Sequence, residues 1–219
     1  MQNEVSVIWF RRDLRLDDNA ALYHALQSGY PVLPLFIFDK NILDKLPDAN
    51  DKRVAFIYAA LQKMQLALAD FHSGITVFYG TPQEAFTELT NLYCIKAVYT
   101  NHDYEQYGID RDASIKAALQ EKNIGFYSYK DVVIFEKEEV VKDDGKPYTV
   151  FTPYSKKWKQ AFSQCPLFIY NTEAHFDKFL NYQSPAMPQL ADMGFWQTEK
   201  VPGWHDFPSS EFPQALIKA

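Results

Sequence analysis

The stretch that decides the fold is VSVIWFRRDLRLDDNAAL, residues 5–22. It opens on a nearly continuous apolar, β-branched run over residues 5–10, which is typical of a strand covered on both faces. A mixed-charge loop with three arginines and three aspartates follows directly over residues 11–18. A short helix is expected over residues 19–28. Strand, charged loop and helix in this order indicate the first unit of an alternating α/β fold.

The same alternation continues to about residue 130. Further strands are expected over 32–38, 75–79, 96–100 and 125–129, and further helices over 51–72, 81–93 and 110–122. Five short strands that alternate with helices predict a doubly wound, Rossmann-like parallel sheet with helices on both sides. The fold class favours the strand order 3-2-1-4-5, so the loops after the first and fourth strands should meet at the switch point, where ligands bind.

Local signals support several of these elements. Asp17 or Asp18 is expected to cap the first helix. Thr81, the proline that follows it and Glu84 form a strong helix start with a capping box. Pro34 is the exception, because it stands inside an apolar run that reads as a buried strand and cannot donate a ladder hydrogen bond.

Composition restricts the class of protein. The chain has 219 residues, 47% of them hydrophobic, so it can bury a sizeable core and disorder is not expected. A net charge of −6 disfavours a broad nucleic-acid-binding face. The two cysteines, Cys94 and Cys165, fit no metal-binding spacing and favour a reducing, cytoplasmic setting. No apolar run approaches the length of a membrane span.

The domain organisation changes after residue 130. Residues 1–130 are predicted to form the α/β domain, and residues 131–219 an interdomain linker with the start of a second, helical domain. Within this part we expect a lid or hairpin and a short helix over 131–163, then a mostly extended stretch over 164–213, because prolines are frequent there. Residues 210–219 can open another helix.

Two loops are candidate sites. The three arginines after the first strand can hold a carboxylate or phosphate in a fork geometry. The alternative is an internal salt-bridge network with the three aspartates of the same loop, and composition alone favours it. The second candidate is the polar stretch after the fourth strand, residues 101–108, for which a site and an ordinary loop are equally favoured. His102 has no obvious partner there, which disfavours a metal site.

Standard catalytic and nucleotide motifs are missing. The sequence contains no GxGxxG, no GxxxxGK[ST], no GxSxG and no HExxH pattern. The turn at residues 79–82 therefore reads as a tight turn with a helix cap and not as a phosphate site. No residue is assigned a catalytic role, and no metal site is expected.

Two stretches resemble the signatures of the photolyase and cryptochrome family. Residues 9–19, WFRRDLRLDDN, are similar to its amino-terminal signature, and residues 145–154, GKPYTVFTPY, resemble its second signature, with Trp158 in the expected place. The resemblance covers essentially the whole chain. It implies the amino-terminal domain of such a protein, ending before the helical domain that would hold FAD and receive damaged DNA. It also implies an antenna pigment in the crevice of the α/β domain, from which excitation passes to reduced FAD.

The resemblance suggests which pigment is bound. Folate-binding members use an Asn-Glu pair after the fourth strand, where this chain has Tyr107 and Gly108, whereas Glu105 and Tyr107 are spaced as in members that bind a deazaflavin or a flavin such as FMN. Phe36, Phe38 and Asp39 would supply a ring wall and a polar contact, and Arg53 would meet an anionic tail. The predicted cofactor-binding set is Arg11, Arg12, Asp13, Phe36, Phe38, Asp39, Arg53, Asp103, Glu105 and Tyr107.

Three functions are compatible with the sequence. The favoured one is part of a deoxyribodipyrimidine photo-lyase, a carbon–carbon lyase that repairs pyrimidine dimers through FAD, with the present chain inactive by itself. The second is the same domain of a cryptochrome-type blue-light receptor. The third is a free-standing nucleotide- or pigment-binding module. The expected partners are the antenna molecule and, through the helical domain, damaged DNA. We expect a monomer that does not associate with membranes.

Overall fold

A computed structural model describes residues 2–166 and 168–196. Five strands form one parallel sheet: β1 (Glu4–Phe10), β2 (Val32–Asp39), β3 (Thr76–Gly80), β4 (Cys94–Asn101) and β5 (Gly125–Tyr129). Their order is β3-β2-β1-β4-β5, which confirms the predicted topology. The chain order reverses between β1 and β4, so these two strands flank the switch point.

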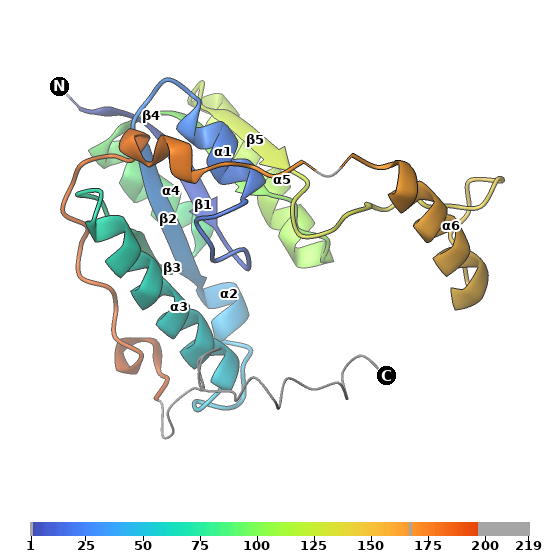
Figure 1. Ribbon diagram of the computed structural model, residues 1–219. Helices are drawn as coiled ribbons and strands as arrows, with labels where there is room; N and C mark the ends of the chain where they lie inside the picture. The colour runs from blue at the N-terminus through green and yellow to red at the C-terminus, as the bar shows by residue number, and fades with distance from the viewer. Residues whose placement is uncertain (1, 167, 197–219) are drawn as a thin grey trace, which may run out of the picture.

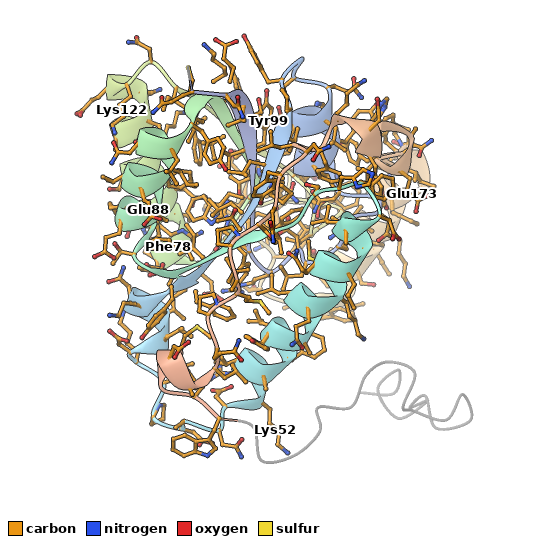
Figure 2. The ribbon with its side chains drawn as sticks, turned by 90° about the vertical axis from the view of Figure 1, so that its left-hand side faces the viewer. Lys52, Phe78, Glu88, Tyr99, Lys122 and Glu173 are labelled. Carbon is orange, nitrogen blue, oxygen red and sulfur yellow. The ribbon has the colours of Figure 1, made fainter. Side chains whose placement is uncertain are left out.

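Helices cover both faces of the sheet (Figure 1). The α-helices of the described residues are α1 (Ala20–Leu26), α2 (Lys40–Leu43), α3 (Lys52–Ala69), α4 (Pro82–Leu92), α5 (Gln106–Glu121) and α6 (Phe151–Gln164). Helices α1 and α3 pack on one face, and α4 and α5 on the other. Figure 2 shows this layering, with Lys52 at the start of α3 and Glu88 on α4 lying on opposite sides of the sheet.

Successive side chains of a strand point alternately toward these two helical layers. On β1, Ile8 and Phe10 pack with α1 and α3, whereas Val7 and Trp9 pack with α4 and α5. All of these side chains are buried, which explains why the strand reads as a continuous apolar run. Pro34 is tolerated in β2 because pairing with β3 begins only at Leu35, so Pro34 has a strand partner on one side only.

The helix caps agree with the sequence in one case and correct it in another. Thr81 and Glu84 form the predicted capping box at the start of α4. The cap of α1 is neither Asp17 nor Asp18 but Asn19, whose side-chain oxygen accepts the N–H of Leu22 at 3.1 Å. Asn19 is fully buried, and its amide serves both the helix and the neighbouring loops, which a carboxylate cannot do because it has no N–H to donate.

Helix α5 begins at Gln106 and not at the predicted residue 110. The polar stretch before it is therefore shorter than expected, and Tyr107 and Gly108 lie in the first helical turn. A side chain at Gly108 would collide with Asp103, because an added Cβ would lie 2.3 Å from the Asp103 Cγ. Glycine thus allows the first turn of α5 to pack directly on the loop after β4.

The carboxyl-terminal half differs in part from the expectation. Residues 131–150 form turns and bends without a strand, so the predicted lid or hairpin has no β-hairpin. The predicted short helix is α6, which carries no fully buried residue and lies away from the sheet (Figure 1). Residues 172–195 return to the α/β domain, where Phe176 and Phe195 join its core.

This returning segment contains two short 3-10 turns, Glu173–Lys178 and Ala191–Met193, and an isolated bridge between Val32 and Phe179. The predicted helix over 210–219 lies outside the described residues. The boundary at residue 130 stays a prediction. Among the described residues, no helix has both the length and the apolar character needed to cross a membrane.

Candidate functional site

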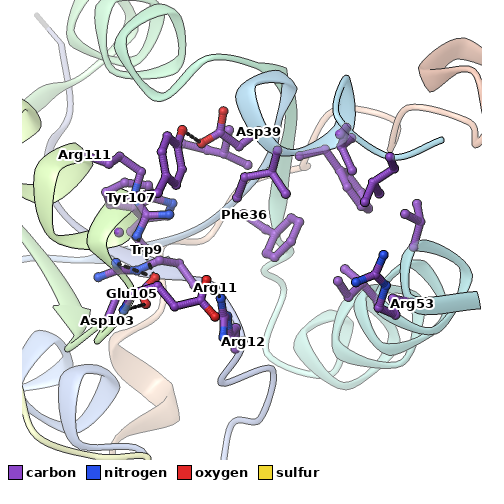
Figure 3. Close-up of a pocket in the computed structure, with 18 residues that line it drawn as sticks. Trp9, Arg11, Arg12, Phe36, Asp39, Arg53, Asp103, Glu105, Tyr107 and Arg111 are labelled. Atoms are coloured by element: carbon purple, nitrogen blue, oxygen red, sulfur yellow. Dashed lines mark hydrogen bonds and ion pairs between the residues drawn. The ribbon is translucent and has the colours of Figure 1, made fainter. Parts of the chain in front are cut away.

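A pocket of about 510 Å³ opens at the carboxyl ends of β1 and β2 and beside the loop after β4 (Figure 3). Its walls come from these segments, from α2 and from the first turns of α3 and α5. Nine of the ten predicted site residues line it, all except Asp13. The loops after the first and fourth strands therefore meet over one pocket, as the strand order predicted.

One wall of the pocket is aromatic and aliphatic. Phe36 and Phe38 lie on β2 with their rings edge to face, 5.0 Å between centroids, and both are nearly fully buried. Trp9 at the end of β1 and Ile42 and Ile57 from the flanking helices complete this wall. Apolar walls with a few polar groups are characteristic of sites for drug-sized organic molecules, which occupy pockets of this volume.

Beside this wall lies a buried ionic cluster, which we call the joint and which consists of Arg11, Asp103, Arg111 and Asp112. The Arg11 guanidinium donates to both Asp112 carboxylate oxygens, at 2.9 and 2.8 Å. Arg111 donates to Asp103 at 3.2 Å and to Asp112 at 3.1 Å. These bonds connect the end of β1 to the loop after β4 and to α5. Such paired geometry orients two guanidinium groups rigidly.

Both arginines of the joint also stack on Trp9. Their guanidinium carbons lie 4.9 Å (Arg11) and 5.0 Å (Arg111) from the centroid of its ring. Burial lowers the pKa of Arg11, and the adjacent Arg111 adds to this effect, while Asp112 opposes it. Arginine remains charged even so, because its unperturbed pKa is far above neutral. The joint therefore fixes two guanidinium groups at the edge of the pocket, with their charge balanced by Asp103 and Asp112.

A polar couple, Tyr107 with Asp39, connects the two sides of the pocket (Figure 3). The Tyr107 hydroxyl donates to one carboxylate oxygen of Asp39, and the other oxygen accepts the N–H of Asn41 at 3.0 Å at the start of α2. Burial and this carboxylate raise the pKa of Tyr107 to about 12, so its hydroxyl stays protonated at neutral pH. The couple gives the pocket one hydrogen-bonding edge.

The outer edge of the pocket, which we call the rim, carries Arg12, Glu105 and Arg53. Arg12 pairs with Glu105 at 2.6 Å, and their side chains are 66% and 64% exposed. Arg53 is 74% exposed and pairs with Asp51 at 2.6 Å. Hydrogen bonding to Arg12 lowers the pKa of Glu105. Exposed pairs of this kind contribute little to stability, so both guanidinium groups can exchange partners at little cost.

Asp13 has a different place. It is buried outside the pocket and accepts hydrogen bonds from the backbone N–H of Arg11 at 2.9 Å and from the side-chain amides of Asn101 at 2.6 Å and Asn19 at 3.2 Å. These bonds hold the loop after β1 in shape. Its oxygens bind other protein groups and do not face the pocket. Asp13 therefore has a structural role, which is to order the arginines of the loop.

The predicted salt-bridge network within the first loop is wrong. Arg11, Arg12 and Arg15 pair with carboxylates from other segments, namely Asp112, Glu105 and Asp131. Two aspartates of the loop have other partners instead: Asp13 accepts the N–H of Arg11 at 2.9 Å, and Asp18 accepts the N–H of Tyr170, far along the chain, at 2.9 Å. The partners lie about a hundred residues away along the chain, so sequence proximity could not reveal them.

His102 also has partners that the sequence did not reveal. Its Nδ1 lies within hydrogen-bond distance of the Glu136 carboxylate, to which the Tyr104 hydroxyl donates at 2.6 Å. This contact attaches the segment after β5 to the loop after β4. Within residues 2–166 and 168–196, no group of three or more histidine, cysteine or acidic side chains is arranged to hold a metal ion.

Several pocket residues were not in the predicted set. Ile42, Leu43 and Leu46 line the pocket from α2 and the turn after it, and Arg111 lines it from α5. Helix α2 has four residues, too few for a periodic pattern to show. Arg111 had a usable signal, because it follows Tyr107 by four residues and so lies on the same face of a helix.

Comparisons with known proteins identify the family. The family model described as DNA photolyase matches residues 6–175. A deoxyribodipyrimidine photo-lyase of Synechococcus sp. is 33% identical over 153 residues, which cover 70% of this chain and 31% of that protein. The chain thus spans about a third of the length of the curated photolyases it matches. An uncharacterized 31.6 kDa protein of Synechococcus sp. strain PCC 6716 is 29% identical over 92% of this chain and 70% of its own length.

Solved structures agree in fold. A bacterial class III photolyase from Agrobacterium tumefaciens superposes with a TM-score of 0.73 at 21% identity, over 88% of this chain and 38% of that one. An archaeal photolyase from Sulfolobus tokodaii, solved with two FAD molecules, superposes with a TM-score of 0.60 at 24% identity, over 80% and 42%. The α/β fold and the family match together show that the chain belongs to the DNA photolyase family and contains its amino-terminal domain.

Proposed function

We propose that this chain is the antenna-chromophore-binding domain of a light-driven deoxyribodipyrimidine photolyase. The observation that carries the proposal is the pocket at the switch point, which combines an aromatic wall, one hydrogen-bonding edge and two exposed arginines at its rim. A flat ring system with an anionic tail has the complementary chemistry. In the Sulfolobus tokodaii photolyase, two bound FAD molecules imply a novel light-harvesting cofactor, which supports this class of ligand for a relative.

Different residues would contact the ring, the polar edge and the anionic tail of such a ligand. Phe36 and Phe38 would contact the ring, and aromatic contacts of this kind add to the free energy of apolar burial. The Tyr107 hydroxyl and Asp39 would hydrogen-bond a polar ring edge. Arg12 and Arg53 would hold a phosphate or carboxylate in a fork geometry. A deazaflavin or FMN satisfies all three requirements, and we favour these over a folate.

In the whole photolyase, the pigment would pass its excitation to FAD in a helical domain, and the excited reduced flavin would donate an electron to the pyrimidine dimer. The bond-splitting chemistry belongs to the cofactor, and the protein's part is to position it. Damaged DNA would be a partner of that helical domain. The present chain by itself is expected not to split dimers under blue light, which an assay on a dimer-containing oligonucleotide measures.

Titration of the purified chain with FMN, riboflavin, a 5-deazaflavin and a reduced folate tests the pigment site. We expect the flavins and the deazaflavin to bind, FMN more tightly than riboflavin, and the folate to bind least. The variant Ile42→Trp puts a large ring into the mouth of the pocket and should weaken FMN binding by about tenfold or more, equivalent to about 1.4 kcal/mol. Absence of binding by both flavins and the deazaflavin overturns the proposal.

The matched control is Phe56→Trp. Phe56 is exposed on α3, close in sequence to pocket residues Val54 and Ile57, but does not line the pocket. This variant introduces the same side chain on a helix that contributes to the pocket but at a position outside it, and should leave FMN binding unchanged. Equal losses in both variants would show that the effect of Ile42→Trp does not come from occupation of the pocket.

A free-standing pigment-binding module is the second candidate. The 31.6 kDa relative favours it, because the aligned region makes up 70% of that protein, against about a third of the photolyases. The two candidates share the same pocket and differ in the acceptor of the excitation. Pigment fluorescence that is quenched when a FAD-loaded helical photolyase domain is added supports the photolyase assignment, and unchanged fluorescence supports the module.

A further inference from the structure

A second hollow lies directly behind the rim of the pocket. It has a volume of about 280 Å³ and lies between the loop after β1, the loop after β4 and the segment after β5. Four residues line both the pocket and this rear hollow: Arg11, Arg12, Asp103 and Glu105. The two spaces are therefore neighbours that share one partition.

Only part of this partition is rigid. Arg11 and Asp103 belong to the joint, with side chains 10% and 13% exposed and partners on both loops. Arg12 and Glu105 are bound mainly to each other and are about two-thirds exposed (Figure 3). An exposed ion pair is opposed by side-chain entropy and screened by salt. Rotation of these two side chains would therefore connect the pocket with the rear hollow at little cost.

The rear hollow suits a second uncharged flat group. Its described polar groups are already engaged: the Asn101 amide donates to Asp13 and Asn19, and the Tyr104 hydroxyl donates to Glu136. What remains available is the rings of His102 and Tyr104 and the side chain of Val132, which is 49% exposed. Such surfaces bind a planar heterocycle by stacking and apolar contact.

Resting on the proposed function, we infer that the ligand of this domain is a two-part molecule whose ring occupies the pocket, whose anionic linker replaces Glu105 as the partner of Arg12, and whose second planar group occupies the rear hollow. This is the chemistry of a dinucleotide or of a ring with a comparable phosphodiester tail. A mononucleotide would place its ring in the pocket and its phosphate at the rim, and would leave the rear hollow empty.

The test compares FMN with FAD on the full chain. Both carry the same ring, and FAD adds a second phosphate and an adenosine. We expect FAD to bind about tenfold more tightly than FMN, as measured by titration at fixed salt. The variant Val132→Trp fills the rear hollow and should reduce FAD affinity to about that of FMN, while FMN affinity stays within about twofold. Unchanged FMN binding also shows that the variant is folded.

Val133→Trp is the control, because Val133 is 36% exposed and adjacent in sequence but lines neither space. It should leave both affinities unchanged. The inference is overturned if FMN binds but FAD binds no more tightly, or if Val132→Trp weakens both ligands equally. If neither flavin binds, the proposed pigment site fails as well, so the two failures are distinguishable.

The variant Glu105→Gln tests the partition itself. Removing the carboxylate charge frees Arg12 for the phosphates, so FAD affinity should rise and its dependence on salt should become steeper. Riboflavin lacks a phosphate and should bind as it does to the unmodified chain. A rise in riboflavin affinity equal to that of FAD would show that Glu105 only obstructs the ring pocket, and would contradict the assigned role of Arg12.

Discussion

Arg11 and Arg12 are neighbours in the chain but lie in two different regions, the joint and the rim. The Arg11 side chain is 10% exposed and forks onto Asp112, whereas that of Arg12 is 66% exposed and holds only Glu105. Both residues lie beyond the end of β1, and the difference comes from their surroundings, because the Arg11 guanidinium reaches β4, where it also donates to the Thr100 hydroxyl at 2.9 Å. The guanidinium of Arg11 thus stabilises the structure, whereas that of Arg12 is available to a ligand.

The comparison shows where function can reside in this domain. The joint cannot change partners without leaving charges buried and unpaired, which is costly. The rim can do so, since water already solvates its groups. A ligand with an anionic tail would therefore reorganise the rim and leave the joint intact. The following predictions test this division, beginning with the largest effect.

Arg11→Met should lower the free energy of unfolding by about 3–5 kcal/mol, because it leaves the buried Asp112 and Asp103 with one cation fewer. Urea unfolding followed by far-ultraviolet circular dichroism measures the change. The control is Arg12→Met, for which no measurable change is expected. Similar losses in both variants would break the distinction between joint and rim.

Asp13→Ala should lower the free energy of unfolding by about 2 kcal/mol, because the Arg11 N–H and two side-chain amides lose a buried acceptor. The loop after β1 would then hold its arginines less firmly, so FMN affinity should fall as well. Asp17→Ala, at an exposed position of the same loop, is the control and should change neither quantity. A stable Asp13→Ala variant would contradict the structural role assigned to this residue.

Asp103→Asn should make the protein less sensitive to acid. Burial alone would raise the pKa of Asp103, but the N–H of Glu105 and three arginines outweigh it and hold the pKa below the usual 3.8. The folded state then gains stability from this carboxylate above that value and loses it as the pH falls through the lowered pKa.

The loss of unfolding free energy between neutral pH and about pH 3 should therefore be smaller in Asp103→Asn than in the unmodified chain. Urea unfolding at a series of pH values measures it. Asp17→Asn, in the exposed part of the loop after β1, should retain the full loss. An identical acid profile for Asp103→Asn and the unmodified chain would show that the joint does not perturb this group.

Arg53→Gln should have the smallest effect, a decrease in FMN affinity of about threefold at low salt with riboflavin affinity unchanged. The reason is that a single exposed guanidinium can contribute only a screened contact to the phosphate. Lys63→Gln, which removes a charge from the same helix but does not line the pocket, is the control. A decrease for riboflavin as large as that for FMN would assign Arg53 to the ring and not to the tail.

Much of the fold was predictable. A strand with two buried faces gives a continuous apolar run, and the predicted bounds of β1 and β5 agree with the observed ones to within about one residue. Helix ends were predicted less well, because a cap depends on its surroundings. Asn19 caps α1 through a buried amide that also contacts Asp13, whereas the sequence predicted Asp17 or Asp18 as the cap.

The site was predictable in its position but not in its contacts. The rule that ligands bind beyond the carboxyl ends of strands at the switch point placed the loops after β1 and β4 together. It could not show that Asp13 faces away from the pocket, that Arg12 pairs with Glu105, or that α2 closes one side. These contacts join residues that are distant along the chain or elements too short to have a period.

The sequence by itself determined the alternation of elements and the charged loop that follows β1, because periodicity and burial act on neighbouring residues; the sheet order came from the fold class that this alternation indicates. Tertiary structure alone decided which of two adjacent arginines is buried, and which carboxylate each arginine meets. Those outcomes depend on how β1, β4 and α5 pack, and packing brings together groups that no local pattern connects. The physical reason is that a charge is stabilised by whatever partner lies within a few ångströms, at any distance along the chain.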